Sequence, residues 1–416
     1  MTAQFIPPAK PILGDDERKA VDEVIASGMV AQGPQVHAFE DEFSSQVVDG
    51  VHCVAVNSGT SALHIGLLAS GIGEGDEVIV PSFTFAATGN SVALSGAKPV
   101  FADVDPVTFT LDPASIEASI TDKTAAIMPV HLYGLPANMA EIVAIATKHG
   151  LKIFEDCAQA HAASIDGKHV GTFGIFGAFS FYPTKNMTSG EGGMITTSDP
   201  EIARKAAMLR NQGMEKRYAN EYVGLNNRMT DIHASIGRVQ LTKLAGWTKT
   251  RQENAAFLSS NITEAITPAV PEGYVHVYHQ YTIRLEGATG EERDRFVTAL
   301  KEEHQVGSGV YYPIPNHRLP SLAPTLRAWS CRTPRRLPPS VSHCRSIPRC
   351  PRLTVSASLP LSIPARKQVP DGESARRHGR HRFDGQEPRP QPARHRRRRS
   401  GRDRGCLRQR PVWSRR

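Results

Sequence analysis

Residues 179–193 read FSFYPTKNMTSGEGG and are followed by MITT at residues 194–197. An apolar, β-prone run therefore leads into a single lysine, Lys185, and a glycine-rich turn separates that lysine from a second β-prone run. This layout predicts one amine in a turn between two strands, with backbone packed closely around it. Burial disfavours the charged form of a lysine, and a neutral amine can attack an aldehyde. A lone lysine at a strand end more often extends its ammonium group into water, so the chemical interpretation depends on the rest of the chain.

Strands and helices alternate on both sides of this stretch. Apolar, β-prone runs predict strands at residues 51–56, 77–80, 99–103, 125–130, 151–154 and 278–285. Amphipathic or capped segments predict helices at residues 15–27, 36–43, 62–70, 139–149, 201–210, 232–259 and 291–304. Alternation of this kind predicts an α/β fold with a mostly parallel sheet covered by helices on both faces. We expect the long helix after residue 232 to bridge to a smaller domain.

Three groups of polar residues follow predicted strands. Gly59, Thr60 and their neighbours turn the first strand into a helix, where free N–H groups, hydroxyls and the helix dipole favour an anion such as phosphate. Asp156 ends a later strand, and Lys185 follows another. Ligands of parallel sheets lie beyond the carboxyl ends of the strands. Each group alone has an ordinary structural explanation, because serine and threonine cap helices and carboxylates end strands; their convergence on one sheet edge is the stronger signal.

These groups match the needs of pyridoxal phosphate, which requires a phosphate cup, an amine for its aldehyde and an acid at its ring nitrogen. Lys185 supplies the amine. Asp156 would keep the ring nitrogen protonated, since an adjacent carboxylate favours the charged ring. Lys185 would then move a proton as general base and acid.

The charge of the chain is unevenly distributed. Residues 321–416 hold 24 arginines, one lysine and five acidic residues, which leaves 24 basic and 36 acidic residues in positions 1–320. Thirteen of the 30 prolines also fall in this last stretch. Such a composition cannot bury enough apolar surface to offset chain entropy and predicts disorder. We hypothesise that the tail is out-of-frame sequence that begins near residues 320–327. An evolved nucleic-acid arm is the less favoured alternative, because interleaved aromatic residues are few.

The remaining composition argues for an intracellular protein. The six cysteines show neither metal-ligand spacing nor a disulfide framework, so no metal is expected. The first residues lack the charged and apolar regions of a signal peptide, and no apolar run reaches the ~20 residues of a membrane span. These features predict a reduced, cytoplasmic location.

Seven motifs, taken in order and spacing, resemble one known family. They are GP at residues 33–34, SGTSAL at 58–63, PSFTF at 81–85, EDCAQA at 155–160, the stretch at 179–193, NNRMTD at 226–231 and YPIP at 312–315. Together they resemble the pyridoxal-phosphate-dependent nucleotide-sugar aminotransferases of the DegT/DnrJ/StrS family over residues 5–320. The resemblance implies the aspartate aminotransferase architecture (fold type I), with a seven-stranded sheet between helices and a smaller α+β domain. It also implies a homodimer.

The resemblance assigns roles to individual residues. Lys185 would be the catalytic residue, and the residues implied to hold the cofactor are Gly59, Thr60, Phe85, Asp156, Gln159, Ser180, Lys185 and Asn226. Phe85 would stack on the ring, Gln159 would lie near the ring hydroxyl, and Asn226 would reach the phosphate of the neighbouring subunit. The sugar would lie near the loop at residues 28–33, which includes Met29, and near Tyr312 and His317. Relatives that dehydrate sugars carry histidine in place of the lysine, so Lys185 favours transamination.

The expected activity is transfer of an amino group from an amino acid, glutamate in most of the family, to a nucleotide-linked keto-sugar for polysaccharide or amino-sugar biosynthesis. The expected organisation is a large cofactor-binding domain at residues 1–240, a small and incomplete domain at 241–320 and the disordered tail at 321–416. Because relatives complete the small domain with a last helix and strand that are not evident here, a non-catalytic protein with an intact cofactor site is an open alternative. Binding of nucleic acid through the basic tail is a weaker one.

Overall fold

The computed structural model describes residues 5–322 and 354–357. Its centre is a seven-stranded sheet in the order β1-β9-β8-β5-β4-β2-β3. The strands are β1 (His52–Val56), β2 (Glu77–Pro81), β3 (Lys98–Ala102), β4 (Thr124–Ile127), β5 (Lys152–Asp156), β8 (Phe176–Ser180) and β9 (Gly193–Thr197). Only β9 runs antiparallel to its neighbours β1 and β8. The other neighbouring strands are parallel, so the predicted mostly parallel α/β sheet is confirmed.

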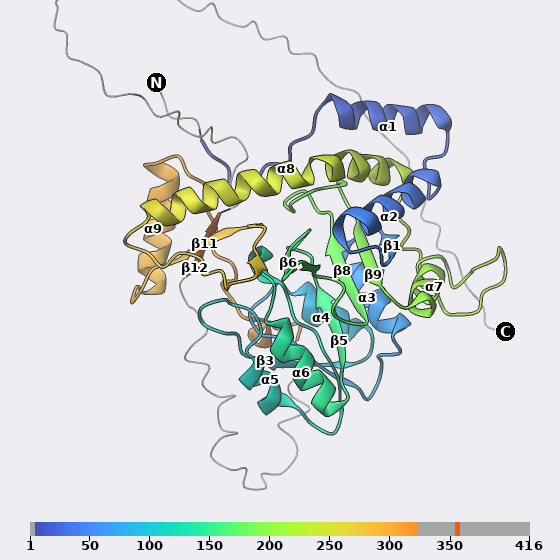
Figure 1. The fold of residues 1–416 in the computed structure, drawn as a ribbon, viewed down its shortest axis with the longest axis horizontal. Helices are drawn as coiled ribbons and strands as arrows, with labels where there is room; N and C mark the ends of the chain where they lie inside the picture. The colour runs from blue at the N-terminus through green and yellow to red at the C-terminus, as the bar shows by residue number, and fades with distance from the viewer. Residues whose placement is uncertain (1–4, 323–353, 358–416) are drawn as a thin grey trace, which may run out of the picture. The chain divides into compact units, whose positions relative to one another are not determined.

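Helices cover both faces of this sheet because its strands are apolar on both sides. One face packs against α3 (Gly59–Ala69), α4 (Ala87–Leu94) and α7 (Pro200–Leu209). The other packs against α2 (Pro34–Val47) and α8 (Asp231–Asn261) at one end and against α5 (Pro113–Ser119) and α6 (Met139–His149) at the other (Figure 1). In β1, Val54 and Val56 join the first core and Ala55 joins the second, as the alternation of side chains along a strand requires.

Helix α3 begins earlier than the sequence predicts. α3 begins at Gly59 rather than at residue 62, because the side chain of Ser58 caps it by accepting a hydrogen bond from the Ser61 N–H at 3.1 Å. Gly59 and Thr60 therefore lie in the first turn of the helix. The first N–H groups of a helix have no partner within it, so this turn presents donors at the carboxyl edge of the sheet.

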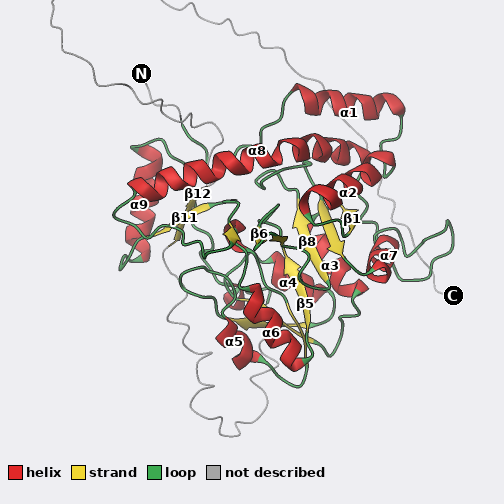
Figure 2. Cartoon of the chain, in the orientation of Figure 1, coloured by secondary structure: helices red, strands yellow, loops and turns green. Residues whose placement is uncertain are grey.

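Two helices lie side by side along one flank of the molecule. α1 (Asp15–Ser27) runs against the long α8, which appears at the top of Figure 1 and as the longest red helix in Figure 2. Glu17 of α1 is buried and accepts hydrogen bonds from Gln240 at 2.7 Å and Lys243 at 2.8 Å of α8. α8 continues without a break through the domain boundary that the sequence predicts at residue 240.

Short elements follow α8. They are β10 (Tyr274–Val275), β11 (Tyr281–Arg284), α9 (Gly290–Glu302) and the 3-10 helix Asn316–Arg318. β10 joins β6 (Ser164–Ile165) and β7 (Lys168–His169) in a three-stranded sheet, and a second 3-10 helix spans Leu132–Gly134. The strand predicted from residue 278 begins only at Tyr281, because Tyr278 has a positive φ of 44°, which extended strands do not accommodate.

β11 pairs with a strand from the predicted tail. β12 (Thr354–Ala357) runs antiparallel to β11, with Tyr281 opposite Ala357 and Arg284 opposite Thr354. The prediction of disorder from residue 321 onward did not anticipate this strand. The rest of that prediction, at residues 323–353 and 358–416, lies outside the described residues.

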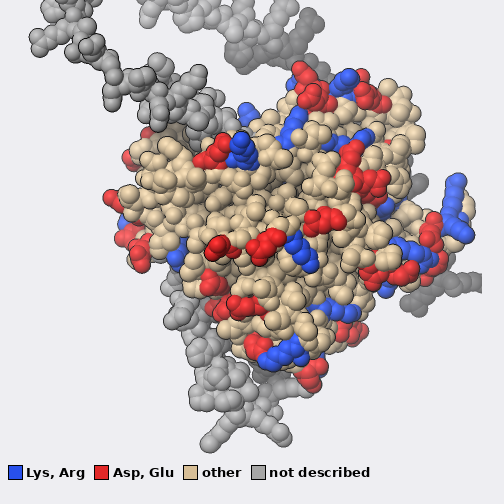
Figure 3. All heavy atoms as spheres, in the orientation of Figure 1, with Lys and Arg blue, Asp and Glu red and all other residues tan. Residues whose placement is uncertain are grey.

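The surface of the described part carries charges of both signs. On the face drawn in Figure 3, acidic and basic side chains lie next to one another. Within residues 5–322 and 354–357, no helix combines the length and apolar character that a membrane crossing requires.

Candidate active site

Lys185 lies in the turn between β8 and β9, as predicted from the sequence. The turn is closed by hydrogen bonds from the Phe181 N–H to the Gly192 carbonyl and from the Lys185 N–H to the Tyr182 carbonyl, each at 2.9 Å. The hydroxyl of Thr188 donates to the Phe181 carbonyl at 2.8 Å. Burial lowers the pKa of Lys185 from 10.5 to about 8, although the negative charge of Asp156 acts in the opposite direction. The turn therefore holds an amine that loses its proton near neutral pH.

Asp156 is the last residue of β5 and is buried. One carboxylate oxygen accepts from the hydroxyl of Thr88, in α4, at 2.7 Å, and the other accepts from the Ala158 N–H at 3.1 Å. Burial raises the pKa of Asp156, whereas these two hydrogen bonds and the charge of Lys185 lower it. A buried carboxylate with neutral donors alone is costly to ionise, so this environment is suited to a cationic partner.

The neighbouring Glu155 points to the opposite face of the strand and organises the backbone there. Its carboxylate accepts from the N–H groups of Gly171, Phe173 and Gly174 at 2.7–2.9 Å and from the His131 ring at 3.1 Å. His131 accepts from the Ala137 N–H through Nδ1 at 2.9 Å, so the neutral ring carries its proton on Nε2 and donates it to Glu155. This fully buried network fixes the end of β5, from which Asp156 projects.

The first turn of α3 and the end of β8 meet closely. A Cβ added to Gly59 would lie 2.6 Å from Cβ of Ser180, so only glycine allows the helix to approach Ser180 this closely. The hydroxyls of Ser58 and Ser61 lie 2.9 Å apart, and Asn227 donates to Ser61 at 3.2 Å. The N–H groups of Gly59 and Thr60 and the Ser180 hydroxyl thus belong to one polar cup at a helix N-terminus.

Aromatic residues form another side of the site. Phe85 has an exposed fraction of 60% and its ring centre lies 6.3 Å from that of Tyr312. Gln159 donates to the Tyr312 hydroxyl at 2.9 Å and accepts from the Tyr133 N–H at 2.6 Å. The structure therefore brings Gln159 and Tyr312, which are far apart in the sequence, into direct contact beside Phe85.

The remaining residues named from the sequence lie in three separate segments. Met29 is in the loop between α1 and α2, with an exposed fraction of 54%. His317 lies in the 3-10 helix after residue 315, and its Nδ1 is 2.5 Å from the Ser82 hydroxyl. Asn226 is exposed and forms an antiparallel bridge with Asn211 through its backbone. The roles assigned to these residues stay predictions.

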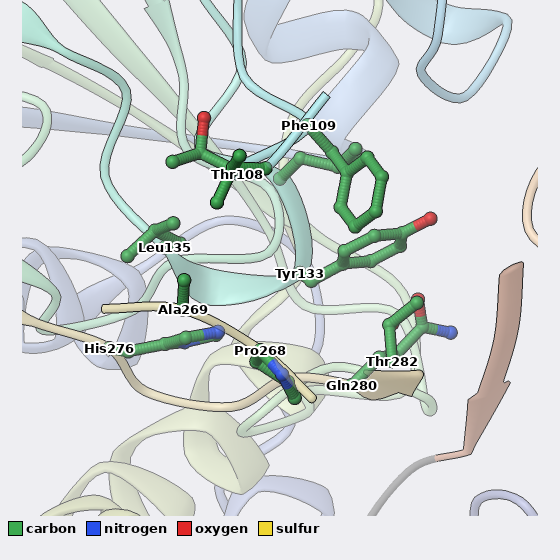
Figure 4. Close-up of a pocket in the computed structure, with 11 residues that line it drawn as sticks. Thr108, Phe109, Tyr133, Leu135, Pro268, Ala269, His276, Gln280 and Thr282 are labelled. Atoms are coloured by element: carbon green, nitrogen blue, oxygen red, sulfur yellow. The ribbon is translucent and has the colours of Figure 1, made fainter. Parts of the chain in front are cut away.

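A small cavity lies beside Tyr133. Figure 4 shows its wall, which comes from residues 107–109 and 132–135 on one side and from residues 268–282 on the other. Gln280 is buried there and its Oε1 has no partner within the described residues. The cavity volume of ≈ 20 Å³ is enough for one water molecule. It is far too small for a sugar, and we do not assign substrate to it.

The residues present fit pyridoxal phosphate. The cup at Gly59 and Ser180 offers donors to a phosphate. The buried carboxylate of Asp156 suits a protonated ring nitrogen. The amine of Lys185, with a pKa of about 8, suits an aldehyde. All three groups lie at the carboxyl edge of the sheet.

Two participants were not identified from the sequence. Thr88 holds Asp156, and Tyr133 holds Gln159. Thr88 lies in α4, a helix that the sequence did not predict, and Tyr133 makes its contact through the backbone N–H. No signal in their own residue types distinguishes them from ordinary core residues.

The fold and the site together define a pyridoxal-phosphate-dependent transferase. The chain belongs to the DegT/DnrJ/EryC1/StrS aminotransferase family, whose model matches residues 11–354. It is therefore an aminotransferase with pyridoxal phosphate as cofactor, as the sequence motifs predicted.

Individual relatives are similar over most of their length. The chain is 43% identical over 323 residues to a UDP-N-acetyl-3-dehydro-alpha-D-glucosamine 3-aminotransferase of Acidithiobacillus ferrooxidans, covering 76% of this chain and 84% of the relative. Among solved structures, DesV of S. venezuelae in complex with a ketimine intermediate is 35% identical, with a TM-score of 0.75 and coverage of 86% of this chain and 95% of DesV. DesI in the presence of its TDP-sugar product is 25% identical, with a TM-score of 0.75 and coverage of 88% and 90%.

Proposed function

We propose that this protein transfers the amino group of an amino acid, with glutamate as the donor, to the ketone of a nucleotide-linked sugar. The observation that carries the proposal is the convergence of Lys185, Asp156 and the cup at Gly59 and Ser180 on one sheet edge. The names of the relatives support the acceptor class, since they include enzymes of UDP-, GDP- and dTDP-linked sugars. The product would be an amino sugar for polysaccharide or glycoside biosynthesis.

The side chains divide the work between binding and proton transfer. Pyridoxal phosphate, when bound, supplies an aldehyde that takes up nitrogen and a ring that spreads the negative charge left on carbon when a proton departs. Asp156 would hold the ring nitrogen in its protonated form, and Thr88 would keep the carboxylate in place. Lys185 would remove a proton from one substrate carbon and return it to another position. Its lowered pKa leaves part of the amine unprotonated near neutral pH.

The sugar would lie on the exposed side of the site. Tyr312 offers aromatic surface there, next to Phe85, which we propose stacks on the cofactor ring, and Gln159 fixes the hydroxyl of Tyr312. Met29 and His317 are the further residues that we propose near the sugar. We propose that the protein works in the cytoplasm; both cysteines within the described ranges, Cys53 and Cys157, are free thiols.

The cofactor test uses covalent trapping. Purified protein is mixed with pyridoxal phosphate, reduced with borohydride and digested, and the masses of its peptides are measured. We expect the added mass on Lys185 in the wild type and no specific added mass in Lys185→Ala. Glutamate added before reduction should prevent the trapping, because nitrogen exchange releases the lysine.

Transfer to the sugar is then measured with three acceptors: UDP-, GDP- and dTDP-linked keto-sugars. Formation of the amino sugar from at least one of them would support the proposed function. A folded protein that traps the cofactor on Lys185 but exchanges nitrogen with no amino acid would instead support the non-catalytic alternative, which the composition of residues 321–416 motivates.

We also propose that the enzyme is a homodimer in which Asn226 of one subunit binds the phosphate in the site of the other. The exposure of Asn226 supports this placement. Lys185→Ala and Asn226→Ala should each be inactive alone. After co-refolding, about a quarter of the sites should have both residues intact, because mixed dimers then carry one complete site. Absence of any recovered activity in verified mixed dimers would contradict the shared site.

A further inference from the structure

One carboxylate joins two helix N-termini that lie far apart in the sequence. Asp231 is the first residue of α8 and has an exposed fraction of 1%. Its Oδ1 accepts from the N–H groups of Gly33 at 2.8 Å and Val36 at 3.1 Å, and its Oδ2 accepts from the Gln35 N–H at 3.2 Å. Its own N–H donates to the Ala31 carbonyl at 2.8 Å.

The local sequence explains why α2 needs this partner. The residue at the N-cap of α2 is Gly33, which has no side chain to accept hydrogen bonds, and Pro34 at the next position has no N–H to offer. The N–H groups that follow still require an acceptor. Asp231 takes the place of the missing cap from another helix. Its negative charge also lies at the positive ends of both α2 and α8.

The same residue holds a loop that carries exposed apolar side chains. The loop at residues 28–33 leads into α2, and its Met29 and Val30 side chains are exposed, at 54% and 45%. Asp231 holds this loop through the Ala31 carbonyl and the Gly33 N–H.

The start of α8 is also in contact with the turn after Lys185. A Cβ added to Gly192 would lie 2.5 Å from Cε of Met229, and one added to Gly190 would lie 3.5 Å from Cδ2 of His233. Met229 and His233 flank Asp231 in the sequence. Residues 229–233, at the start of α8, are therefore in contact with both the exposed apolar loop and the turn that carries Lys185.

We propose that Asp231 is a positioning residue that fixes the loop at residues 28–33 beside the Lys185 turn and so sets the affinity for the keto-sugar. The small amino acid donor needs only Lys185, Asp156 and the polar cup, and its reaction does not depend on this loop. The inference rests on the proposed function, because it assigns the loop to the second substrate of the transfer. It predicts that loss of the Asp231 contact impairs the half of the reaction that uses the keto-sugar and leaves the half that uses glutamate nearly unchanged.

Two changes disturb the contact from opposite sides. Asp231→Asn keeps an oxygen for Gly33 and Val36 but turns an amide NH2 toward the Gln35 N–H. Gly33→Ala leaves the carboxylate in place, yet the new Cβ would lie 2.8 Å from Oδ2 of Asp231. Gly33 has extended backbone with φ −162°, so alanine introduces this contact without backbone strain. The second variant also guards against a failure of the first to fold.

Glu17→Gln is the matched control. Glu17 is another buried carboxylate that ties the N-terminal region to α8, through Gln240 and Lys243, but it does not hold the loop. It reports the effect of loosening a different contact of α8, the one with α1.

The experiment measures three quantities in the holoenzyme. Amide hydrogen exchange should accelerate at residues 33, 35 and 36 in Asp231→Asn and Gly33→Ala and stay slow in Glu17→Gln. The KM for whichever of the UDP-, GDP- and dTDP-linked keto-sugars the wild type uses should rise about tenfold or more, as the loss of a charge-assisted hydrogen bond implies. The single-turnover rate with glutamate alone should change less than about twofold.

The outcomes separate the inference from the function on which it rests. Loss of the glutamate reaction in step with the sugar reaction would overturn the inference, because it would indicate a general structural role. An unchanged KM for the sugar in a wild-type-active background would overturn it as well. If the wild type itself uses none of the three sugars, the proposed function fails and the inference fails with it.

Discussion

The charge of Asp156 acts to raise the pKa of Lys185, and the charge of Lys185 acts to lower the pKa of Asp156. Burial lowers the pKa of the lysine and raises that of the aspartate, so each group alone tends toward its neutral form. Their mutual attraction favours the charged forms. The cofactor would replace this balance with two separate partners, an aldehyde for the amine and a ring nitrogen for the carboxylate.

The lowered pKa of Lys185 makes the stability of the cofactor-free protein depend on pH. Between pH about 8, its folded pKa, and 10.5, its ordinary value, the folded protein has released this proton while the unfolded chain still holds it. The unfolded state then binds more protons, so the contribution of Lys185 to the free energy of unfolding rises with pH across this window. Below the window the buried charge is destabilising.

Lys185→Met should therefore melt at a higher temperature than the wild type near pH ~7, and this advantage should shrink as the pH approaches ~10. Thermal unfolding of both cofactor-free proteins over this pH range checks the expectation. Lys19→Met, at an exposed position of α1, is the control, whose difference from the wild type should stay nearly constant. A constant difference for Lys185→Met as well would contradict the lowered pKa.

The end of β5 depends on a residue that does not face the site. Glu155 collects four hydrogen bonds on the side opposite Asp156. Glu155→Gln would turn an amide NH2 toward donors that need an acceptor, and we expect it to lower the free energy of unfolding by about 3 kcal/mol. Urea denaturation measures this loss.

Glu77→Gln provides the comparison. Glu77 begins β2 of the same sheet and bonds Lys98 and Thr121 at 2.8 and 2.7 Å, but its lysine partner is partly exposed. Glu77→Gln should lower the free energy of unfolding by no more than about 1 kcal/mol. Equal losses for the two variants would mean that the four-donor network has no special weight.

The sequence predicted the regular elements where a pattern was long or a cap was clear. The helix predicted at residues 232–259 is observed as α8. It could be predicted because Thr230 caps it and its spacing of buried residues continues for many turns. Lys185 was placed correctly between two strands for a similar reason: apolar runs stand on both sides of a glycine-rich turn. α4 was missed because it is short and its N-cap residue, Ala86, gives no capping signal.

The residues of the candidate site also fall into those that the sequence could predict and those that it could not. Lys185, Asp156 and Gly59 could be found because each ends or follows a strand, and the parallel sheet brings such positions together. Thr88 and Asp231 could not be assigned from local pattern, since their roles come from contacts across 68 and 195–198 residues of chain. Long-range contacts of this kind leave no periodic trace in the sequence.

The whole chain divides into a unit at residues 1–364 and a second unit at residues 365–416. The first unit contains β12, which supplies the edge partner of β11. An unpaired strand edge is prone to association with other chains. Residues 354–357 therefore matter to the body of the protein.

Two truncations should behave differently. A stop after Pro364 should leave the melting temperature and the monodispersity of the protein unchanged, because the first unit is intact. A stop after Leu322 removes β12 and should lower the melting temperature and promote aggregation, as seen by thermal unfolding and size-exclusion chromatography. Identical behaviour of the two truncated proteins would show that β12 contributes nothing to the body.

The pairing of β1 with β9 has a consequence for how this chain is made. Val56 of β1 is paired with Gly193 of β9, and among the described strands β1 has no other neighbour in the sheet. At ~5–20 residues per second, a ribosome that has finished β1 needs on the order of ten seconds to deliver its partner. During that interval Val54 and Val56, both core residues, have no sheet to join. β1, which leads into the polar cup at Gly59, is thus the first strand of this sheet to be synthesised, and it can pair only after the last strand of the sheet, β9, has been made.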